Sequence, residues 1–122
     1  MATFEKVEPI KITDNNTGEI YTLDFSRDTV RFAEERGFVW DEIGTRPATM
    51  VPIIWYTAFR RYNPRVSYAK ATEILEKLGG MKPNWITRLR ELYDQSLISL
   101  ISVDESEGDE DKAKNAEMTV EL

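Results

Sequence analysis

Apolar and polar residues alternate over two short stretches near the start of the chain. Residues 10–13 and 20–25 are rich in Ile, Thr, Tyr and Phe, and in the second stretch the apolar positions 21, 23 and 25 alternate with polar ones. This period of two is typical of a strand with one buried face. The residues between the stretches include Asp-Asn-Asn-Thr-Gly, which favours a turn, so the pattern predicts a β-hairpin.

The period becomes helical after the second stretch. Ser26 precedes a helix that we predict over residues 27–36, because Ser is a favoured N-cap and Gly37 can end the helix in a left-handed conformation. Val30 is expected to face inward, with Phe32 beside it.

Three further helices are predicted. The first covers residues 50–62 and is apolar on nearly all sides, which indicates a central helix contacted from several directions. Ser67 caps the next helix, which ends at the Gly-Gly pair 79–80. Pro83 opens the last helix, whose apolar stripe continues for about five turns.

These elements predict an α+β fold that is mainly α, with an N-terminal β-hairpin, about four helices and a disordered acidic C-terminal tail. A chain of 122 residues has room for one domain, which we assign to residues 1–102. Residues 103–122 contain no aromatic residue and no sustained periodicity, and they carry eight acidic against two basic residues. We expect this tail to be disordered because it cannot bury enough apolar surface to offset the entropy of ordering it.

The composition removes most catalytic mechanisms. The chain contains no Cys and no His, so it lacks thiolate nucleophiles, the usual general base near neutral pH and the commonest metal ligand. The acidic pairs Glu34/Glu35 and Asp41/Glu42 are the remaining candidates, but adjacent helical residues point about 100° apart and do not share one site. We therefore expect no catalytic residue, no metal site and no cofactor, and we predict that the protein is not an enzyme.

Charge is distributed unevenly along the chain, whose net charge is −6. Residues 1–45 carry five basic and ten acidic residues, whereas residues 46–90 carry nine basic and two acidic residues. The basic region 46–90 leaves open an alternative function, a small phage or bacterial regulator that binds DNA or RNA. Binding to a protein is the preferred interpretation, because residues 1–102 are neutral overall and the acidic tail would repel phosphate.

Aromatic residues are numerous for a domain of this size. The chain has three Trp, five Tyr and five Phe, and Trp is favoured at the centres of protein interfaces. Trp40 is the best candidate for exposure, because it lies in the irregular connection between the first two helices. We predict a contact with a protein partner in which Arg side chains frame an apolar centre. Its expected residues are Phe38, Trp40, Arg60, Arg61 and Arg65.

The order of the elements carries a family resemblance. The segments YTLDFSRDTVRFAEERGF and TRPATMVPIIWYTAFRRYNP are followed by a Ser-capped helix and a Gly-Gly break. With the hairpin before them, they resemble the tail assembly chaperones of long-tailed phages and prophages of Gram-positive bacteria. The likeness covers about residues 8–100 and consists of apolar, Gly and Pro positions, not of a catalytic signature.

The resemblance implies a non-enzymatic assembly factor that binds the tape measure protein and keeps it soluble while tail tube subunits polymerise around it. The expected partners are the tape measure protein and the tail tube protein, with self-association left open. The resemblance also implies that the factor acts in the host bacterial cytoplasm and is absent from the mature virion. No stretch approaches the roughly 18 apolar residues of a membrane span or resembles a signal peptide, so we expect no membrane contact.

Overall fold

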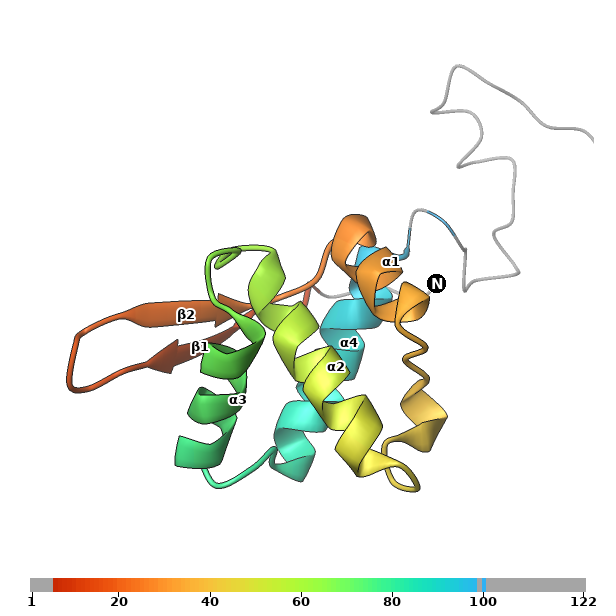
Figure 1. Ribbon diagram of the computed structural model, residues 1–122. Coiled ribbons are helices and arrows are strands. Elements are labelled where there is room, and N and C mark those ends of the chain that lie inside the picture. Colours follow the sequence, from red (N-terminus) through yellow and green to blue (C-terminus); the bar gives the residue numbers. More distant parts are fainter. Residues whose placement is uncertain (1–5, 99, 101–122) are drawn as a thin grey trace, which may run out of the picture.

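The structure is a computed structural model that describes residues 6–98 and residue 100. A two-stranded antiparallel hairpin is followed by four α-helices, so the predicted α+β fold, mainly α, is confirmed (Figure 1). The predicted tail, residues 103–122, lies outside the described residues. In chain order the elements are β1 (Ile10–Thr13), β2 (Ile20–Leu23), α1 (Arg27–Glu35), the short 3-10 helix η1 (Trp40–Glu42), α2 (Pro47–Arg60), α3 (Tyr68–Lys77) and α4 (Pro83–Ser96).

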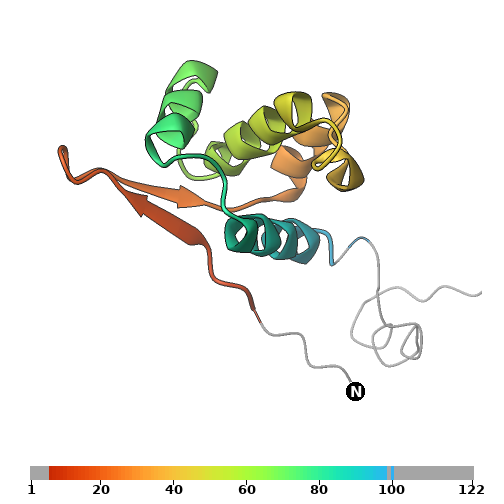
Figure 2. The ribbon, with the colours of Figure 1, turned by 90° about the horizontal axis from the view of Figure 1, so that it is seen from below.

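The elements form two layers. Helices α1, α2 and α3 make one layer, and the hairpin and α4 make the other (Figure 2). Among the described residues, sixteen buried apolar side chains form one core cluster, contributed by β2, the four helices and the connections next to α1. No helix in the described part of the chain is both long enough and apolar enough to cross a membrane.

The hairpin turn is built by short polar side chains. Asp14 Oδ1 accepts hydrogen bonds from the backbone N–H groups of Asn16 and Thr17, at 2.9 and 3.3 Å. Gly18 follows with φ of 81°, a left-handed conformation that glycine adopts without strain. In the strand after the turn, Tyr21 and the residue two positions later are buried, as the alternation predicts.

Strand β2 ends two residues earlier than predicted, and its edge away from β1 is bonded to α2 and to the turn after α2. The backbone N–H of Asp24 donates to the carbonyl of Ala58 in α2 at 3.1 Å. The N–H of Thr22 donates to Asn63 Oδ1, in the turn after α2, at 3.0 Å. These bonds fix α2 against the edge of β2 that faces away from β1.

Helix α1 begins where the sequence predicts it. Ser26 Oγ accepts from the N–H of Thr29 at 3.3 Å, and Thr29 Oγ1 accepts from the N–H of Ser26 at 2.8 Å, which completes a capping box. The helix ends at Glu35, one residue before the predicted end, and Gly37 follows with φ of 83°. Val30 is buried as expected.

Helix α2 begins three residues before the predicted start and ends two before the predicted end. Pro47 is its first residue, a position where the missing N–H has no helical partner to lose. The helix lies between α1 and α3, with α4 behind it (Figure 1). Trp55, on its buried side, donates its indole N–H to the carbonyl of Ala71 in α3 at 2.8 Å.

Helix α3 begins and ends at the predicted signals, and α4 begins at its predicted signal. Ser67 Oγ accepts from the N–H of Lys70 at 3.0 Å and caps α3. Gly79 and Gly80 follow α3 with φ of 82° and 97°. Pro83 is the first residue of α4, which ends at Ser96 and is therefore shorter than the predicted five turns.

Candidate partner-binding face

Three aromatic rings from three helices meet on the outer side of the helical layer. Phe32 of α1 lies with its ring centroid 5.8 Å from that of Tyr56 in α2, and Tyr56 lies 5.7 Å from Tyr68 in α3. Both pairs are edge-to-face, a favoured arrangement of aromatic rings. Phe32 and Tyr56 are half-buried, and Tyr68 is 52% exposed. The rings therefore form a continuous aromatic surface that solvent or a partner can reach.

Two arginine side chains complete this surface. The guanidinium carbons of Arg36 and Arg60 lie 3.4 and 4.0 Å from the centroid of the Phe32 ring. Arg60 Nη1 also donates to the hydroxyl of Tyr56 at 3.1 Å. Guanidinium groups stack favourably on aromatic rings and are weakly hydrated compared with an ammonium group. We call Phe32, Arg36, Tyr56, Arg60 and Tyr68 the aromatic–arginine face.

Helical spacing explains why these residues meet. Arg36 follows Phe32 by four positions in and just after α1, and Arg60 follows Tyr56 by four positions in α2. Residues four apart lie on the same side of a helix, so each arginine lies beside an aromatic residue of its own helix. Tyr68 is the first residue of α3 and contacts Tyr56 across the boundary between the helices.

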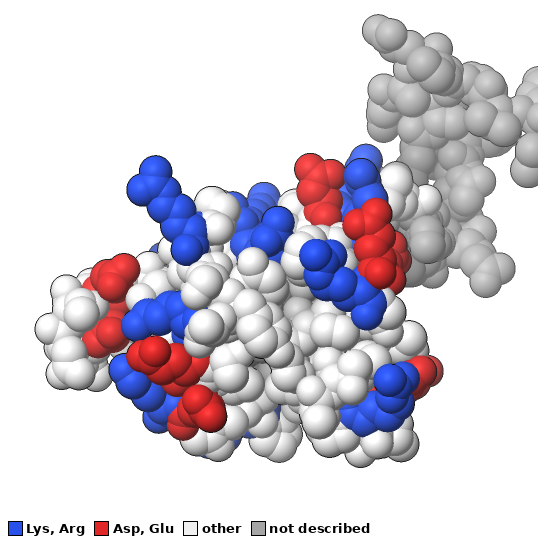
Figure 3. All heavy atoms as spheres, viewed as in Figure 1, with Lys and Arg blue, Asp and Glu red and all other residues white. Residues whose placement is uncertain are grey.

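The surface around the face is largely uncharged. In the view that looks onto α1, α2 and α3, Lys, Arg, Asp and Glu gather toward the margins and leave a broad neutral area over α2 (Figure 3). Ile53, one turn before Tyr56, is a half-buried residue packed against the core. An aromatic area with a charged rim is typical of surfaces that bind other proteins.

Two of the residues predicted to contact a partner are less exposed than expected. Phe38 is only 6% exposed and lies in the core, so the prediction that its side chain contacts a partner is not supported. Trp40 was expected to be exposed, but it is half-buried. Its ring lies 4.8 Å from that of Phe38 and 5.2 Å from that of Tyr93 of α4, and these two rings cover part of it. Its indole N–H is buried and has no hydrogen-bond partner among the described residues.

The three predicted arginines do not frame one contact. Arg60 belongs to the aromatic–arginine face. Arg61 Nη1 instead bonds to Asp24 Oδ2 at 3.1 Å and to the carbonyl of Phe25 at 2.8 Å, so it ties α2 to the segment after β2. Arg65 lies in the turn between α2 and α3. Consecutive helical residues point in different directions, and this separates Arg60 from Arg61.

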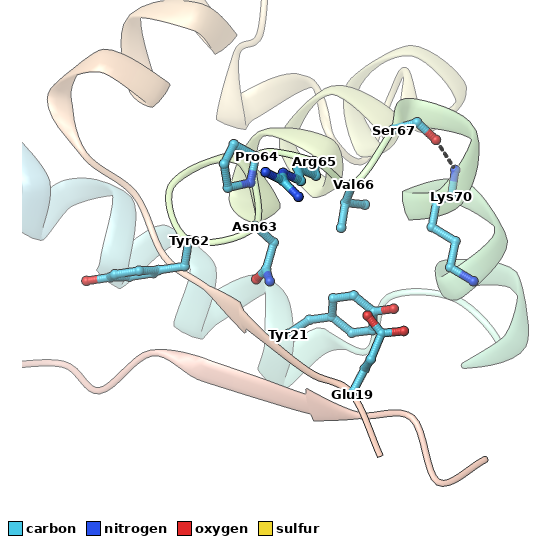
Figure 4. Close-up of a pocket in the computed structure, with 9 residues that line it drawn as sticks. All are labelled: Glu19, Tyr21, Tyr62, Asn63, Pro64, Arg65, Val66, Ser67 and Lys70. Atoms are coloured by element: carbon cyan, nitrogen blue, oxygen red, sulfur yellow. Dashed lines mark hydrogen bonds between the residues drawn. The ribbon is translucent and has the colours of Figure 1, made fainter. Parts of the chain in front are cut away.

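Arg65 borders a polar groove between β2 and the turn that joins α2 to α3 (Figure 4). The groove has a volume of about 510 Å³, and Asn63 extends from the turn toward the strand. Its charged lining residues are Glu19, Arg65 and Lys70. Tyr21 forms part of its floor, and burial raises the pKa of the Tyr21 hydroxyl, with a smaller contribution from Glu19. None of the five residues of the aromatic–arginine face lines this groove.

Ion pairs occupy much of the basic region 46–90. For example, Lys77 Nζ and Lys70 Nζ lie 3.1 and 3.5 Å from Glu73 Oε1, and a hydrogen bond from Lys77 is the main cause that lowers the pKa of the Glu73 carboxyl. Five of the nine basic residues lie within 4.0 Å of a carboxylate oxygen, namely Arg46, Arg61, Lys70, Lys77 and Arg88. The charge available to a phosphate backbone is therefore smaller than the sequence suggests.

The sequence carries a partial signal for the aromatic–arginine face. The spacing of four between Phe32 and Arg36, and between Tyr56 and Arg60, is visible in the sequence and indicates arginine–aromatic stacking on a helix surface. The meeting of the two pairs across α1 and α2 depends on tertiary packing and has no such signal.

Metal ligation finds no support in the described part of the chain, where no three Asp or Glu side chains are grouped to hold an ion. The comparisons with known proteins add only the family. Neither the curated proteins nor the solved structures contain a match to this chain. A family model matches all of residues 1–122, and the chain therefore belongs to the family described as a domain of unknown function, DUF5055.

Proposed function

We propose that this protein is a non-enzymatic phage tail assembly chaperone, which binds the tape measure protein and keeps it soluble in the host bacterial cytoplasm while the tail tube assembles. The observation that carries the proposal is the aromatic–arginine face, which exposes apolar rings on a folded body. A chaperone of this kind needs an adaptable apolar contact and enough charge to remain in solution. The resemblance of the sequence to tail assembly chaperones supplies the specific partner.

The face suits an apolar helix of a long partner. It extends over three helices, and its ring edges and guanidinium groups can contact both apolar side chains and the polar flank of a helix. Arg36 and Arg60 are already held against Phe32, so little side-chain entropy is lost when a partner binds. Tyr and Arg are also enriched among the residues that dominate binding energy at interfaces.

The test is co-expression with the tape measure protein, followed by pull-down of the soluble complex at salt concentrations from about 50 to about 200 mM. Tyr68→Ala combined with Arg60→Ala should weaken the complex by about tenfold or more, because hot-spot truncations cost about 2 kcal/mol or more. Tyr62→Ala is the matched control, since Tyr62 is 51% exposed, as Tyr68 is 52% exposed, but contacts Arg61 away from the face. The control should bind as the unmodified protein does.

The same experiment separates the alternative function. A contact made by apolar rings should lose little affinity over this salt range, whereas DNA or RNA binding through several phosphates falls by orders of magnitude. Failure to co-purify with the tape measure protein, together with tight and salt-sensitive nucleic-acid binding, would reject the chaperone and support a regulator that uses region 46–90. Equal losses in Tyr68→Ala/Arg60→Ala and in Tyr62→Ala would reject the aromatic–arginine face.

A further inference from the structure

Strand β1 has one open backbone edge. Strands β1 and β2 pair in an antiparallel register, and just beyond their ends the N–H of Asp14 donates to the carbonyl of Glu19. In such a ladder, pairs of residues that bond to each other alternate with pairs that do not. By this alternation Lys11 and Thr13 direct their N–H and carbonyl groups away from β2. Within residues 6–98 none of these four groups has a hydrogen-bond partner. Figure 2 shows β1 as the outer strand of the hairpin.

An apolar groove lies beside this edge. It has a volume of about 270 Å³ and is lined by β1 together with Trp55, Leu78 and Trp85. Ile10 and Ile12 are half-buried, on the inner face of the strand. A strand added along β1 would place every second side chain on that inner face, against the same groove. The edge and the groove together therefore fit an extended segment with alternating apolar residues.

The end of this chain has that pattern. We propose that residues 116–122, Ala-Glu-Met-Thr-Val-Glu-Leu, add to β1 as a third strand and cover the groove with Met118, Val120 and Leu122. The apolar residues alternate with Glu117, Thr119 and Glu121, which would lie on the solvent face of the sheet. This segment is richer in apolar residues than the part of the tail before it. In the proposal, residues 101–115 are the linker between α4 and the added strand.

Charge favours this occupant over a second copy of β1. Lys11 lies on the exposed face of β1, and in the described residues it has no carboxylate within 4.0 Å. Glu117 and Glu121, on the same solvent face of the added strand, would bring opposite charge to Lys11. Pairing of β1 with β1 of another copy would instead bring two lysines together, which is unfavourable.

The linker is long enough for the segment to reach the groove in the same chain. Trp85 is the third residue of α4, and Leu100 follows the far end of that helix. A helix of 14 residues is about 21 Å long. Residues 101–115 can span about 50 Å when extended at about 3.3 Å per residue. Tethering through a linker of this length favours docking within one chain over docking between chains, because it raises the effective concentration of the segment.

Docking would protect the only strand edge of the hairpin that the described residues leave open. Open edges are templates for pairing with other chains and for aggregation, and natural proteins cover or charge them. The proposal concerns the layer opposite the aromatic–arginine face and does not depend on the identity of any partner.

Hydrogen exchange measured by NMR on the full chain tests the proposal. The amide protons of Lys11 and Thr13 should exchange at least about tenfold more slowly than in a variant that cannot dock. This is the protection expected if the segment is bound about nine-tenths of the time. Met118→Asp/Val120→Asp is that variant. Ser106→Asp/Ala113→Asp adds the same charge to the linker and should retain the protection.

The amide of Ile12, which faces Tyr21 within the hairpin, is the internal reference and should be equally protected in all three proteins. Unprotected Lys11 and Thr13 amides in the unmodified chain would overturn the proposal, as would protection that survives Met118→Asp/Val120→Asp. Protection that increases with protein concentration would assign the covering strand to a second molecule and would overturn docking within one chain.

Discussion

Truncation of Phe59 tests the packing of the central helix. Phe59 of α2 is 0% exposed, and its ring lies edge-to-face with Tyr21 of β2 at 5.8 Å and with Trp55 at 5.4 Å. It therefore joins the two layers at the centre of the core. Phe59→Ala removes the whole ring from this position and with it the edge-to-face contacts to Tyr21 and Trp55.

The expected loss follows from two contributions. The apolar surface of the ring accounts for about 2 kcal/mol of transfer free energy. A cavity of about 100 Å³ that does not collapse adds about 2 kcal/mol, at about 24 cal/mol per Å³. Tyr21 and Trp55 are held by β2 and by a hydrogen bond to α3, so little collapse is expected. The free energy of unfolding should fall by about 3 to 5 kcal/mol, a large part of the stability of a small domain.

The assay is urea denaturation followed by tryptophan fluorescence and far-UV circular dichroism, with the midpoint and slope fitted for each protein. Phe59→Leu is the graded control, because it retains much of the volume and should lose only about 1 to 1.5 kcal/mol. It also gives a measurable value if Phe59→Ala does not fold. A Phe59→Ala protein with an unchanged slope and a loss below about 1 kcal/mol would show that the ring is not part of a tightly packed core.

Two further predictions concern the start of α1 and the behaviour at high pH. Ser26→Ala should lower the free energy of unfolding by about 1 kcal/mol by removing the N-cap, whereas Ser26→Asn should retain most of it, as judged by urea denaturation; equal values for the two variants would contradict the capping role. Burial, with smaller contributions from Glu34 and Asp94, raises the pKa of Tyr93 to about 12. The unfolded state therefore loses this proton first, so the stabilisation is complete below about pH 10 and is lost as pH rises toward about 12. Tyr93→Phe should make the urea midpoint less dependent on pH between about 9 and about 11 than in the unmodified protein, and an unchanged dependence would refute the assignment.

The predictable parts of the fold have causes that lie close together in the sequence. The hairpin follows from strand alternation and from a turn whose stabilising features are local. Asp14 accepts a hydrogen bond from the N–H of Asn16, and Gly18 adopts a left-handed conformation. Helices α1 and α3 follow from their caps, Ser26 and Ser67, each of which binds an N–H three residues ahead. Pro83 marks the start of α4 for a similarly local reason.

The parts that could not be predicted depend on distant residues. Trp40 is covered by Tyr93, which lies on α4 and cannot be paired with it from sequence. Arg61 bonds to Asp24, which lies 37 residues earlier in the chain. The sequence around Arg61 therefore gives no sign that this side chain is bound within the domain. Helix α2 is apolar on nearly all sides, and its sequence does not reveal that the side carrying Tyr56 faces outward. The aromatic–arginine face was missed for this last reason.

The two proposed surfaces differ in what they recognise. The aromatic–arginine face presents side chains only, because the backbone groups of α1, α2 and α3 are used within the helices. It would therefore select a partner by the shape and apolar character of its side chains. The edge of β1 presents backbone N–H and carbonyl groups at Lys11 and Thr13, which bind any extended segment whose alternate side chains fit the groove. An edge this permissive favours a cover such as the one proposed from the same chain, whereas the more selective face suits a separate partner.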